Sequence, residues 1–396
     1  MSWCDRHSIL QPEQSAFRPG RDAQEQVALL TQRAVQAMNG GLVTAVAALD
    51  VAKAFDSVWH AGLVRQCIVD LPTGVARWVA AFLRDRTAAV LEDGSVSRRF
   101  PTLAGVPQGS PISPLLYAFY TRSMPLPRTP MTGATVYADD VAVWASAQTP
   151  AAAWSLLEPR LQEMVEWGRC WRLRFSPEKT QLICLSRRTG WTLPSVSFDG
   201  AQLEWAAHLD LLGVRLDRML RFRQHAVNVC QRLRPTVLEL RRLTAASRAV
   251  PVWVGALLYK SLVRSSLLFA VPTLTMACET TWLTLETLER HALRAALRLS
   301  QFWRTPNAEV YRRTRIDPLR RVASERAASF LQRHVRSRNR RLLAGFASCS
   351  SGLTLMTCCD CLWFPLITWA LSSWLLCVGV LSGNWESDVR CCFDKA

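Results

Sequence analysis

Two adjacent acids interrupt a strand-like apolar stretch of this sequence and restrict how the chain can fold. Residues 135–145 read TVYADDVAVWA, with apolar residues on both sides of Asp139 and Asp140. This pattern predicts two buried strands joined by a tight turn that carries both acids. An earlier apolar run of strand length, LVTAVAALD at residues 42–50, also ends in an acid, Asp50. If these strands are neighbours in one sheet, three carboxylates lie at the same edge.

Three clustered carboxylates repel one another unless a cation offsets their charge. Their hard oxygen ligands suit Mg²⁺, with Mn²⁺ as an alternative. Two such ions about 4 Å apart can activate a hydroxyl group and stabilise a displaced pyrophosphate, as nucleotidyl transfer requires. Each acid also has a simpler explanation, because Asp pairs in hairpin turns are often only solvated and a strand-terminal Asp often caps the next helix. The residues around the acids therefore have to decide between these interpretations.

The order of the predicted elements indicates an α+β unit followed by a helical region. Strands and helices alternate as far as residue 217, whereas residues 220–345 are almost entirely helix-like. The predicted helical segments are 22–38, 58–85, 113–121 and 154–171, and the further predicted strand segments are 90–100, 175–186 and 208–217.

The positive charge of the chain is concentrated in that helical region. The 396 residues have a net charge of +17, and between Arg218 and Arg341 there are 25 Lys and Arg against 7 Asp and Glu. A solvated helix face usually has balanced charge, so this excess indicates a polyanionic partner, either nucleic acid or an acidic membrane. The 13 cysteines show no pairing pattern, which favours a reducing compartment.

Six segments resemble the motifs of LINE-type (non-LTR) reverse transcriptases, and they occur in the same order as in that family. The first is similar to a fingers motif and the other five to successive palm motifs. No single motif would identify the family, but six in register over residues 14–217 do. The segments are QSAFRPGR (14–21), ALDVAKAFDSVWH (48–60), AGVPQGSPISP (104–114), YADD (137–140), SPEKT (176–180) and LLGV (211–214).

The resemblance implies a catalytic role for the acids and for one lysine. Asp50 and Asp139 would bind both metal ions, with Asp140 supporting them. Lys179 would protonate or neutralise the departing pyrophosphate. Asp56 is expected to point away from the metal site, into local hydrogen bonding near the following helix.

The resemblance also implies residues that bind the nucleotide and the primer. The aromatic ring of Phe55 would exclude a 2′-hydroxyl, Gln108 and Gly109 would lie against the nucleotide and its templating base, and Arg18 would meet the triphosphate. Each has an ordinary structural alternative, namely a core aromatic, a turn before a helix and a surface arginine. The primer grip would be shaped by Leu212 and Gly213.

The implied fold is a right-hand polymerase of α+β class, with a ferredoxin-like palm. Residues 1–40 would form partial fingers, 41–217 the palm and the rest of the fingers, with the motifs, and 218–347 a basic, all-helical thumb with its extension. Residues 348–396 would follow as a hydrophobic tail rich in Cys and Trp. The implied reaction is RNA-directed DNA synthesis from a DNA primer, an RNA template and dNTPs, with two Mg²⁺ ions, in the nucleus.

Two other functions remain open. An RNA-dependent RNA polymerase shares the paired acids, although Phe55 argues against it. A catalytically inactive RNA-binding remnant would keep the basic helices and polymerise nothing. The sequence does not predict the oligomeric state.

Both ends of the sequence depart from the family pattern. Met1 lies just before the fingers motif, so a truncated copy that lacks the earlier fingers strand is expected. Residues 361–385 carry no charge and are long enough to span a bilayer. We favour a frameshift or truncation product over a membrane anchor, since a lone span has no evident purpose here. A zinc site is rejected because no histidine accompanies Cys358 and Cys361.

Smaller departures occur inside two motifs. Ala16 stands where the family usually has glycine, and Ser176 stands where it usually has asparagine.

Overall fold

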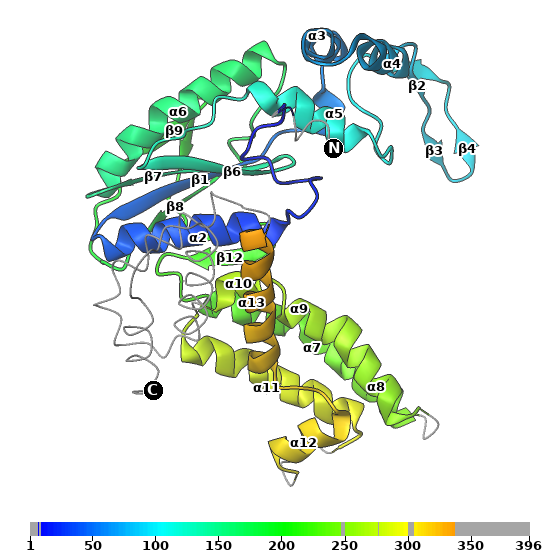
Figure 1. Cartoon of the computed structure of the whole chain (residues 1–396), viewed down its shortest axis with the longest axis vertical. Helices are drawn as coiled ribbons and strands as arrows, with labels where there is room; N and C mark the ends of the chain where they lie inside the picture. Colours follow the sequence, from blue (N-terminus) through cyan, green and yellow to red (C-terminus); the bar gives the residue numbers. More distant parts are fainter. Residues whose placement is uncertain (1–6, 8, 247–249, 276, 300–304, 337–396) are drawn as a thin grey trace, which may run out of the picture. The chain divides into compact units, whose positions relative to one another are not determined.

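The computed structural model of the chain describes residues 7, 9–246, 250–275, 277–299 and 305–336. The chain divides between Leu220 and Arg221 into two compact units (Figure 1). The expected tail, with its apolar segment and its Cys358 and Cys361, lies outside the described residues. Within the described ranges, none of the helices combines the length and the apolar composition that crossing a bilayer requires.

A four-stranded antiparallel sheet forms the centre of the first unit. Its strand order is β6-β7-β1-β8, so the predicted strand near residue 43 and the predicted acidic hairpin are neighbours. The strands are β1 (Val43–Leu49), β6 (Thr132–Tyr137), β7 (Asp140–Ala147) and β8 (Gln181–Leu185). Along the chain, helices follow β1, the β6–β7 hairpin comes next, and one long helix leads to β8.

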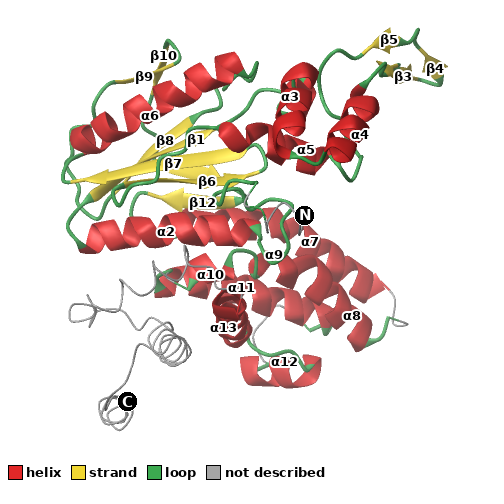
Figure 2. Cartoon of the chain, turned by 45° about the horizontal axis from the view of Figure 1, so that its top comes forward, coloured by secondary structure: helices red, strands yellow, loops and turns green. Residues whose placement is uncertain are grey.

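Helix α2 (Ala23–Asn39) covers one face of this sheet and α6 (Pro150–Cys170) covers the other (Figure 2). The Asp22 side chain accepts a hydrogen bond from the backbone N–H of Glu25 and caps the start of α2. Thr149 caps α6 in the same way, through the N–H of Ala152. Because of this cap, α6 begins several residues before the predicted start at residue 154.

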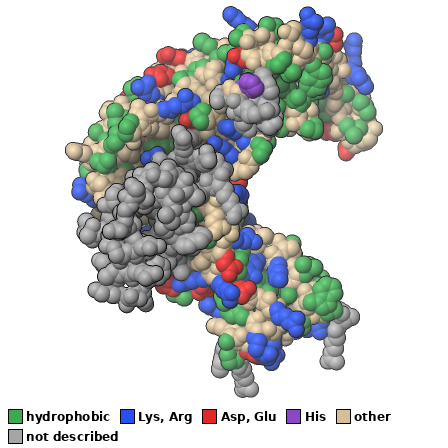
Figure 3. All heavy atoms as spheres, viewed as in Figure 1, with side chains coloured by type: hydrophobic (Ala, Val, Ile, Leu, Met, Phe, Trp, Pro, Cys, Tyr) green, Lys and Arg blue, Asp and Glu red, His purple; other side chains and the backbone are tan. Residues whose placement is uncertain are grey.

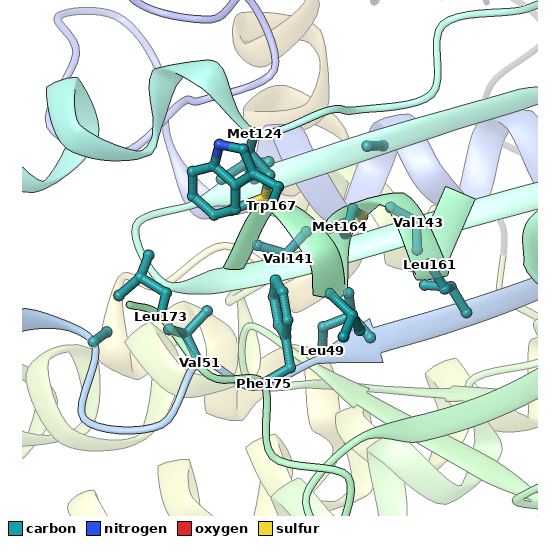
Figure 4. Packing of buried hydrophobic residues seen from close by; sticks show 14 of the residues in the cluster. Leu49, Val51, Met124, Val141, Val143, Leu161, Met164, Trp167, Leu173 and Phe175 are labelled. Atoms are coloured by element: carbon teal, nitrogen blue, oxygen red, sulfur yellow. The ribbon is translucent and has the colours of Figure 1, made fainter. Parts of the chain in front are cut away.

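The core of the first unit lies between the sheet and α6. Alternate residues of the strands point to this side, as the period of two in a strand requires. Each fully buried aliphatic side chain stabilises the fold by about 1.5–3 kcal/mol. Figure 4 shows the packing of Leu49, Val141, Val143, Leu161, Met164 and Trp167, all of which are buried.

The segment between β1 and β6 contains several short helices and two small sheets. The predicted helical stretch 58–85 is two helices rather than one, because Pro72 interrupts the chain and stands directly before the second. Within the predicted strand segment 90–100, Asp93-Gly94 forms the turn between β3 and β4. The elements are η1 (Phe55–Ser57), α3 (His60–Asp70), α4 (Thr73–Leu83), β2 (Thr87–Ala88), β3 (Leu91–Glu92), β4 (Ser95–Val96), β5 (Phe100–Pro101), α5 (Ser113–Tyr120) and η2 (Thr121–Ser123).

Two further hairpins complete the first unit. The hairpin of β11 (His208–Leu211) and β12 (Val214–Asp217) lies in the predicted strand segment 208–217. The hairpin of β9 (Val196–Phe198) and β10 (Ala201–Leu203) was not predicted. Its turn, Asp199-Gly200, has positive φ at both residues, which is the Asp-Gly hairpin signal that sequence analysis overlooked.

The described part of the second unit is helical, as predicted. Helices α7 and α11 pack against each other. In Figure 3, Lys and Arg side chains recur over the helices of this unit, with a few Asp and Glu side chains between them. The elements are α7 (Arg223–Ala246), α8 (Val252–Leu258), a π-helix (Tyr259–Arg264), α9 (Ser265–Leu267), α10 (Val271–Leu274), α11 (Glu279–Ala296), α12 (Asn307–Thr314) and α13 (Leu319–Arg336).

Candidate active site

The three predicted acids meet at one edge of the four-stranded sheet. Leu49 pairs with Val141, so extending this register by one residue places Asp50 opposite Asp140, the first residue of β7. Asp139 precedes it in the two-residue turn that links β6 to β7. Residues far apart in sequence are thus brought together because β1 and β7 are neighbouring antiparallel strands.

The charges of these acids act on one another. The pKa of Asp140 is raised, first by partial desolvation and then by the negative charges of Asp139 and Asp50. Asp140 is exposed at the surface, so its desolvation comes from protein atoms around the turn rather than from enclosure. Among the described residues, no three His, Cys, Asp or Glu side chains form a preassembled metal site.

Lys179 forms an ion pair with Asp50 at this edge. Its Nζ lies 3.3 Å from Oδ2 of Asp50, yet that buried oxygen has no hydrogen bond. The two charges are therefore close enough to attract each other, but the contact does not have the geometry of a hydrogen bond. The segment is held in place by the backbone, since the N–H of Ser176 donates to Asp50 O at 2.8 Å and Val51 bridges to Phe175.

Phe55 lies in the short 3-10 helix after β1 and stacks on the ring of Tyr117 from α5. Their centroids are 4.7 Å apart, with an angle of 26° between the ring planes. Tyr117 is buried, and its pKa is raised by that burial and then by the charge of Asp139. Phe55 is only half-buried, so part of the residue remains accessible beside this stack.

The segment around Gln108 packs on the same 3-10 helix. The N–H of Val106 donates to Phe55 O at 2.8 Å, and Gln108 Nε2 donates to Asp56 Oδ1 at 3.0 Å. The partner of Asp56 is thus this segment and not the following helix, which corrects the expectation from sequence. A Cβ at Gly105 would lie 3.0 Å from the backbone of Asp56, whereas one at Gly109 would meet nothing within 4 Å. The backbone of Gly105 is therefore packed closely against Asp56, whereas there is space for a side chain at Gly109.

Arg18 lies on the loop before α2. Its Nη1 donates to the carbonyl oxygens of Gln11 and Gln14, both at 3.1 Å. The guanidinium group therefore holds this loop, and its expected contact with a triphosphate stays a prediction.

Leu212 and Gly213 form the turn of the β11–β12 hairpin. Both have positive φ, 49° and 80° respectively, which gives the primed turn that two-residue hairpins favour. The hairpin belongs to a sheet separate from the one that carries the acids.

Sequence analysis assigned no role to Gln14, which contacts the acidic turn directly. Its side-chain amide exchanges two hydrogen bonds with the backbone of Ala138, the residue before Asp139. The only signal for it in the sequence was its place at the start of the fingers-like segment.

Comparisons with known proteins cover the segment that carries these acids. The family model described as "Reverse transcriptase (RNA-dependent DNA polymerase)" matches residues 2–216. The RNA-directed DNA polymerase from mobile element jockey of Drosophila melanogaster is 31% identical over 303 residues, which are 75% of this chain and 33% of that protein. The probable RNA-directed DNA polymerase from transposon BS of the same species is 28% identical over 295 residues, 72% of this chain and 32% of that protein.

This chain therefore spans about a third of the length of the curated relatives that it matches. Among solved structures, a telomerase from Candida tropicalis in complex with a telomeric RNA fragment is similar over 87% of this chain and 52% of that chain, at 12% identity and a TM-score of 0.41.

Proposed function

Because the chain belongs to the reverse transcriptase (RNA-dependent DNA polymerase) family, we propose that it is the RNA-directed DNA polymerase part of a non-LTR retrotransposon. It would extend the 3′-end of a DNA primer with dNTPs on an RNA template. The observation that carries this proposal is the meeting of Asp50, Asp139 and Asp140 at one sheet edge, where their charges interact. All three lie inside the segment that matches the family.

We assign the parts of a right-hand polymerase to the two units. The sheet with order β6-β7-β1-β8 and its helices would be the ferredoxin-like palm. Residues 1–40 would be partial fingers, and residues 218–347 the thumb and its extension. Arg-rich helices suit salt-sensitive contacts with the phosphates of a template–primer duplex, in agreement with the charge of +18 between Arg218 and Arg341.

The acids suit a pair of Mg²⁺ ions. Mg²⁺ in polymerase-type sites is typically held by one or two carboxylates together with substrate phosphates, so no preassembled protein cage is needed. Asp50 Oδ2 is buried and has no hydrogen bond, and Asp140 has a raised pKa beside two like charges. Both features favour a cation. Asp50 and Asp139 would hold the ions with support from Asp140, and the bound ions would lower the pKa of the primer hydroxyl and stabilise the displaced pyrophosphate.

Side chains near the acids would orient the nucleotide. Phe55 is held by its stack on Tyr117, so its accessible face can exclude a 2′-hydroxyl. Gly109 leaves open space in which a base pair can approach the backbone. Lys179 reaches the acidic edge from its own segment and could neutralise a departing pyrophosphate.

Other substrate contacts rest on the family motifs. Arg18 would meet the triphosphate, Gln108 the nucleotide, and Leu212 and Gly213 the primer. A chromosomal DNA primer would place the reaction in the nucleus.

Primer extension tests the proposal. The purified chain is given a poly(rA)/oligo(dT) template–primer, Mg²⁺ and dTTP, and we expect extension that falls about 1,000-fold in Asp139→Asn, because the electrostatic stabilisation of the transition state is lost. Asp93→Asn is the matched control, since Asp93 also lies in a two-residue hairpin turn but far along the chain from the acids.

Three outcomes would overturn the proposal. Equal use of UTP and dTTP would indicate an RNA polymerase. Extension that survives Asp139→Asn would place the chemistry elsewhere. Salt-sensitive RNA binding without extension would identify the chain as an inactive RNA-binding remnant.

A further inference from the structure

We propose that Gln14 is a positioning residue that fixes the turn carrying Asp139, so that the fingers segment controls the geometry of the catalytic acids. This inference rests on the proposed polymerase function and adds a residue to its machinery. Gln14 would touch neither substrate nor metal, and would act through the backbone of Ala138.

The side chain of Gln14 makes three hydrogen bonds, all with backbone groups. Its Oε1 accepts from the N–H of Ala138 at 2.9 Å and from the N–H of Ala16 at 3.0 Å. Its Nε2 donates to the carbonyl oxygen of Ala138 at 3.2 Å. Gln14 is 3% exposed, so these bonds form away from water, where an unpaired amide would be costly. One buried side chain therefore fixes both backbone groups of the residue next to Asp139.

Ala138 needs such support because of its backbone conformation. Its φ is 58°, a left-handed value that costs a non-glycine residue about 1–2 kcal/mol. Strained residues of this kind persist where the surrounding structure holds them, and they gather at functional sites. Loss of the Gln14 contacts would free the turn to relax and would move Asp139 relative to Asp50.

The segment that carries Gln14 is itself anchored to the sheet. Gln14 forms a parallel bridge with Val136 of β6, and the N–H of Ser15 donates to Val136 O at 3.0 Å. Glu13 forms a two-bond ion pair with Arg128, at 3.1 and 2.9 Å. This segment lies beside β6, the outer strand of the sheet, and these contacts hold the backbone of Gln14 against it.

Arg18 connects the same segment to the proposed nucleotide site, because its Nη1 donates to the backbone oxygen of Gln14. The residue expected to meet the triphosphate and the residue that holds the acidic turn are thus joined directly. A fingers-like segment with this construction does more than bind the nucleotide, since it also sets the position of the acids.

Gln14→Met tests the inference, since methionine has a similar length and shape but cannot form the hydrogen bonds. We expect kcat for dTTP to fall about 100-fold, as small misplacements of catalytic groups do, with KM unchanged within about threefold. Mn²⁺ binding, followed by electron paramagnetic resonance, should weaken about tenfold, as on loss of an outer-shell partner of a metal ligand. Amide exchange in a peptide covering residues 136–141 should become about tenfold faster.

Gln14→Glu is a second variant that keeps the accepting oxygen and loses the donor. It should retain protection of the Ala138 amide while losing activity. The matched control is Gln32→Leu, which removes another buried glutamine of the first unit whose amide has no hydrogen-bond partner among the described residues. It should change none of these readouts.

The results separate this inference from the polymerase proposal. A wild-type chain without extension would contradict the polymerase proposal, and amide exchange and Mn²⁺ binding would still decide the role of Gln14. Normal kcat and Mn²⁺ affinity in folded Gln14→Met would overturn the inference. Equal effects in Gln32→Leu would also overturn it, because they would indicate general loss of packing.

Discussion

Each of the two units contains carboxylates that interact with other side chains, but the partners of these carboxylates differ. In the second unit, Glu289 is fully buried, and its Oε1 accepts from the hydroxyl of Tyr259 at 2.8 Å. Its Oε2 accepts from the hydroxyl of Tyr311 at 2.9 Å and from the N–H of Leu319 at 3.0 Å. At the sheet edge of the first unit, the acids face one another instead, and Asp50 Oδ2 has no hydrogen bond.

This difference separates a carboxylate that holds the fold from carboxylates available to a cation. Burial raises the pKa of Glu289, while hydrogen bonds from Tyr259, Tyr311 and Leu319 act in the opposite direction. These donors come from the π-helix, α12 and the start of α13. A single acid on α11 therefore connects three other helical elements. At the sheet edge, Lys179 approaches Asp50, but Asp50 Oδ2 accepts no hydrogen bond from any described residue.

Removal of Glu289 should have the largest effect on stability. Glu289→Ala leaves three donors without an acceptor, so we expect the free energy of unfolding of the second unit to fall by about 3 kcal/mol. Urea denaturation followed by circular dichroism measures this change. Glu239→Ala, at an exposed ion pair of α7, serves as control and should stay within about 0.5 kcal/mol of the wild type. If Glu289→Ala lowered the free energy of unfolding by less than about 1 kcal/mol, Glu289 would not be an acid that holds the fold.

Asp140→Asn should show the reverse pattern, with a large loss of activity and none of stability. The substitution removes a charge that the fold disfavours, so the melting temperature without metal should stay the same or rise. Primer extension should fall about 100-fold. A melting temperature several degrees lower would instead make Asp140 a structural acid like Glu289.

The smallest effect concerns pH. Since the folded-state pKa of Glu289 is raised above 4.5, its contribution to stability is complete below that value and is lost as the pH rises through the raised pKa. The neutral Glu289→Gln variant lacks this dependence. Melting temperatures of both proteins between pH 4 and 7.5 should show the wild type losing stability relative to the variant as the pH rises. Parallel curves would contradict the assigned direction of the shift.

The sequence predicted those features that depend on local pattern. Apolar runs of strand length located β1 and the β6–β7 hairpin, and acids at the ends of these runs located the candidate site. The meeting of the acids also required β1 and β7 to be neighbours, which the resemblance to a known family implied and the strand order confirms.

Features that depend on distant contacts could not be predicted in this way. Gln14 reaches Ala138 across 124 positions of sequence, and nothing local distinguishes it from a surface glutamine. The hydrogen bond between Asp56 and Gln108 spans 52 positions, and the pairing of Glu289 with two tyrosines depends on how helices pack. By contrast, the β9–β10 hairpin was missed although its Asp-Gly turn was visible in the sequence.

The central position of β1 also has a consequence for biosynthesis. This strand is synthesised before its two neighbours, β7 and β8, which end at Ala147 and Leu185. Until those neighbours are made, a nascent chain carries an apolar strand with two unpaired edges, a state prone to mispairing. All four strands precede Leu220, and domains generally fold as units from the N-terminus. The acidic edge can thus form while the arginine-rich helices are still being translated.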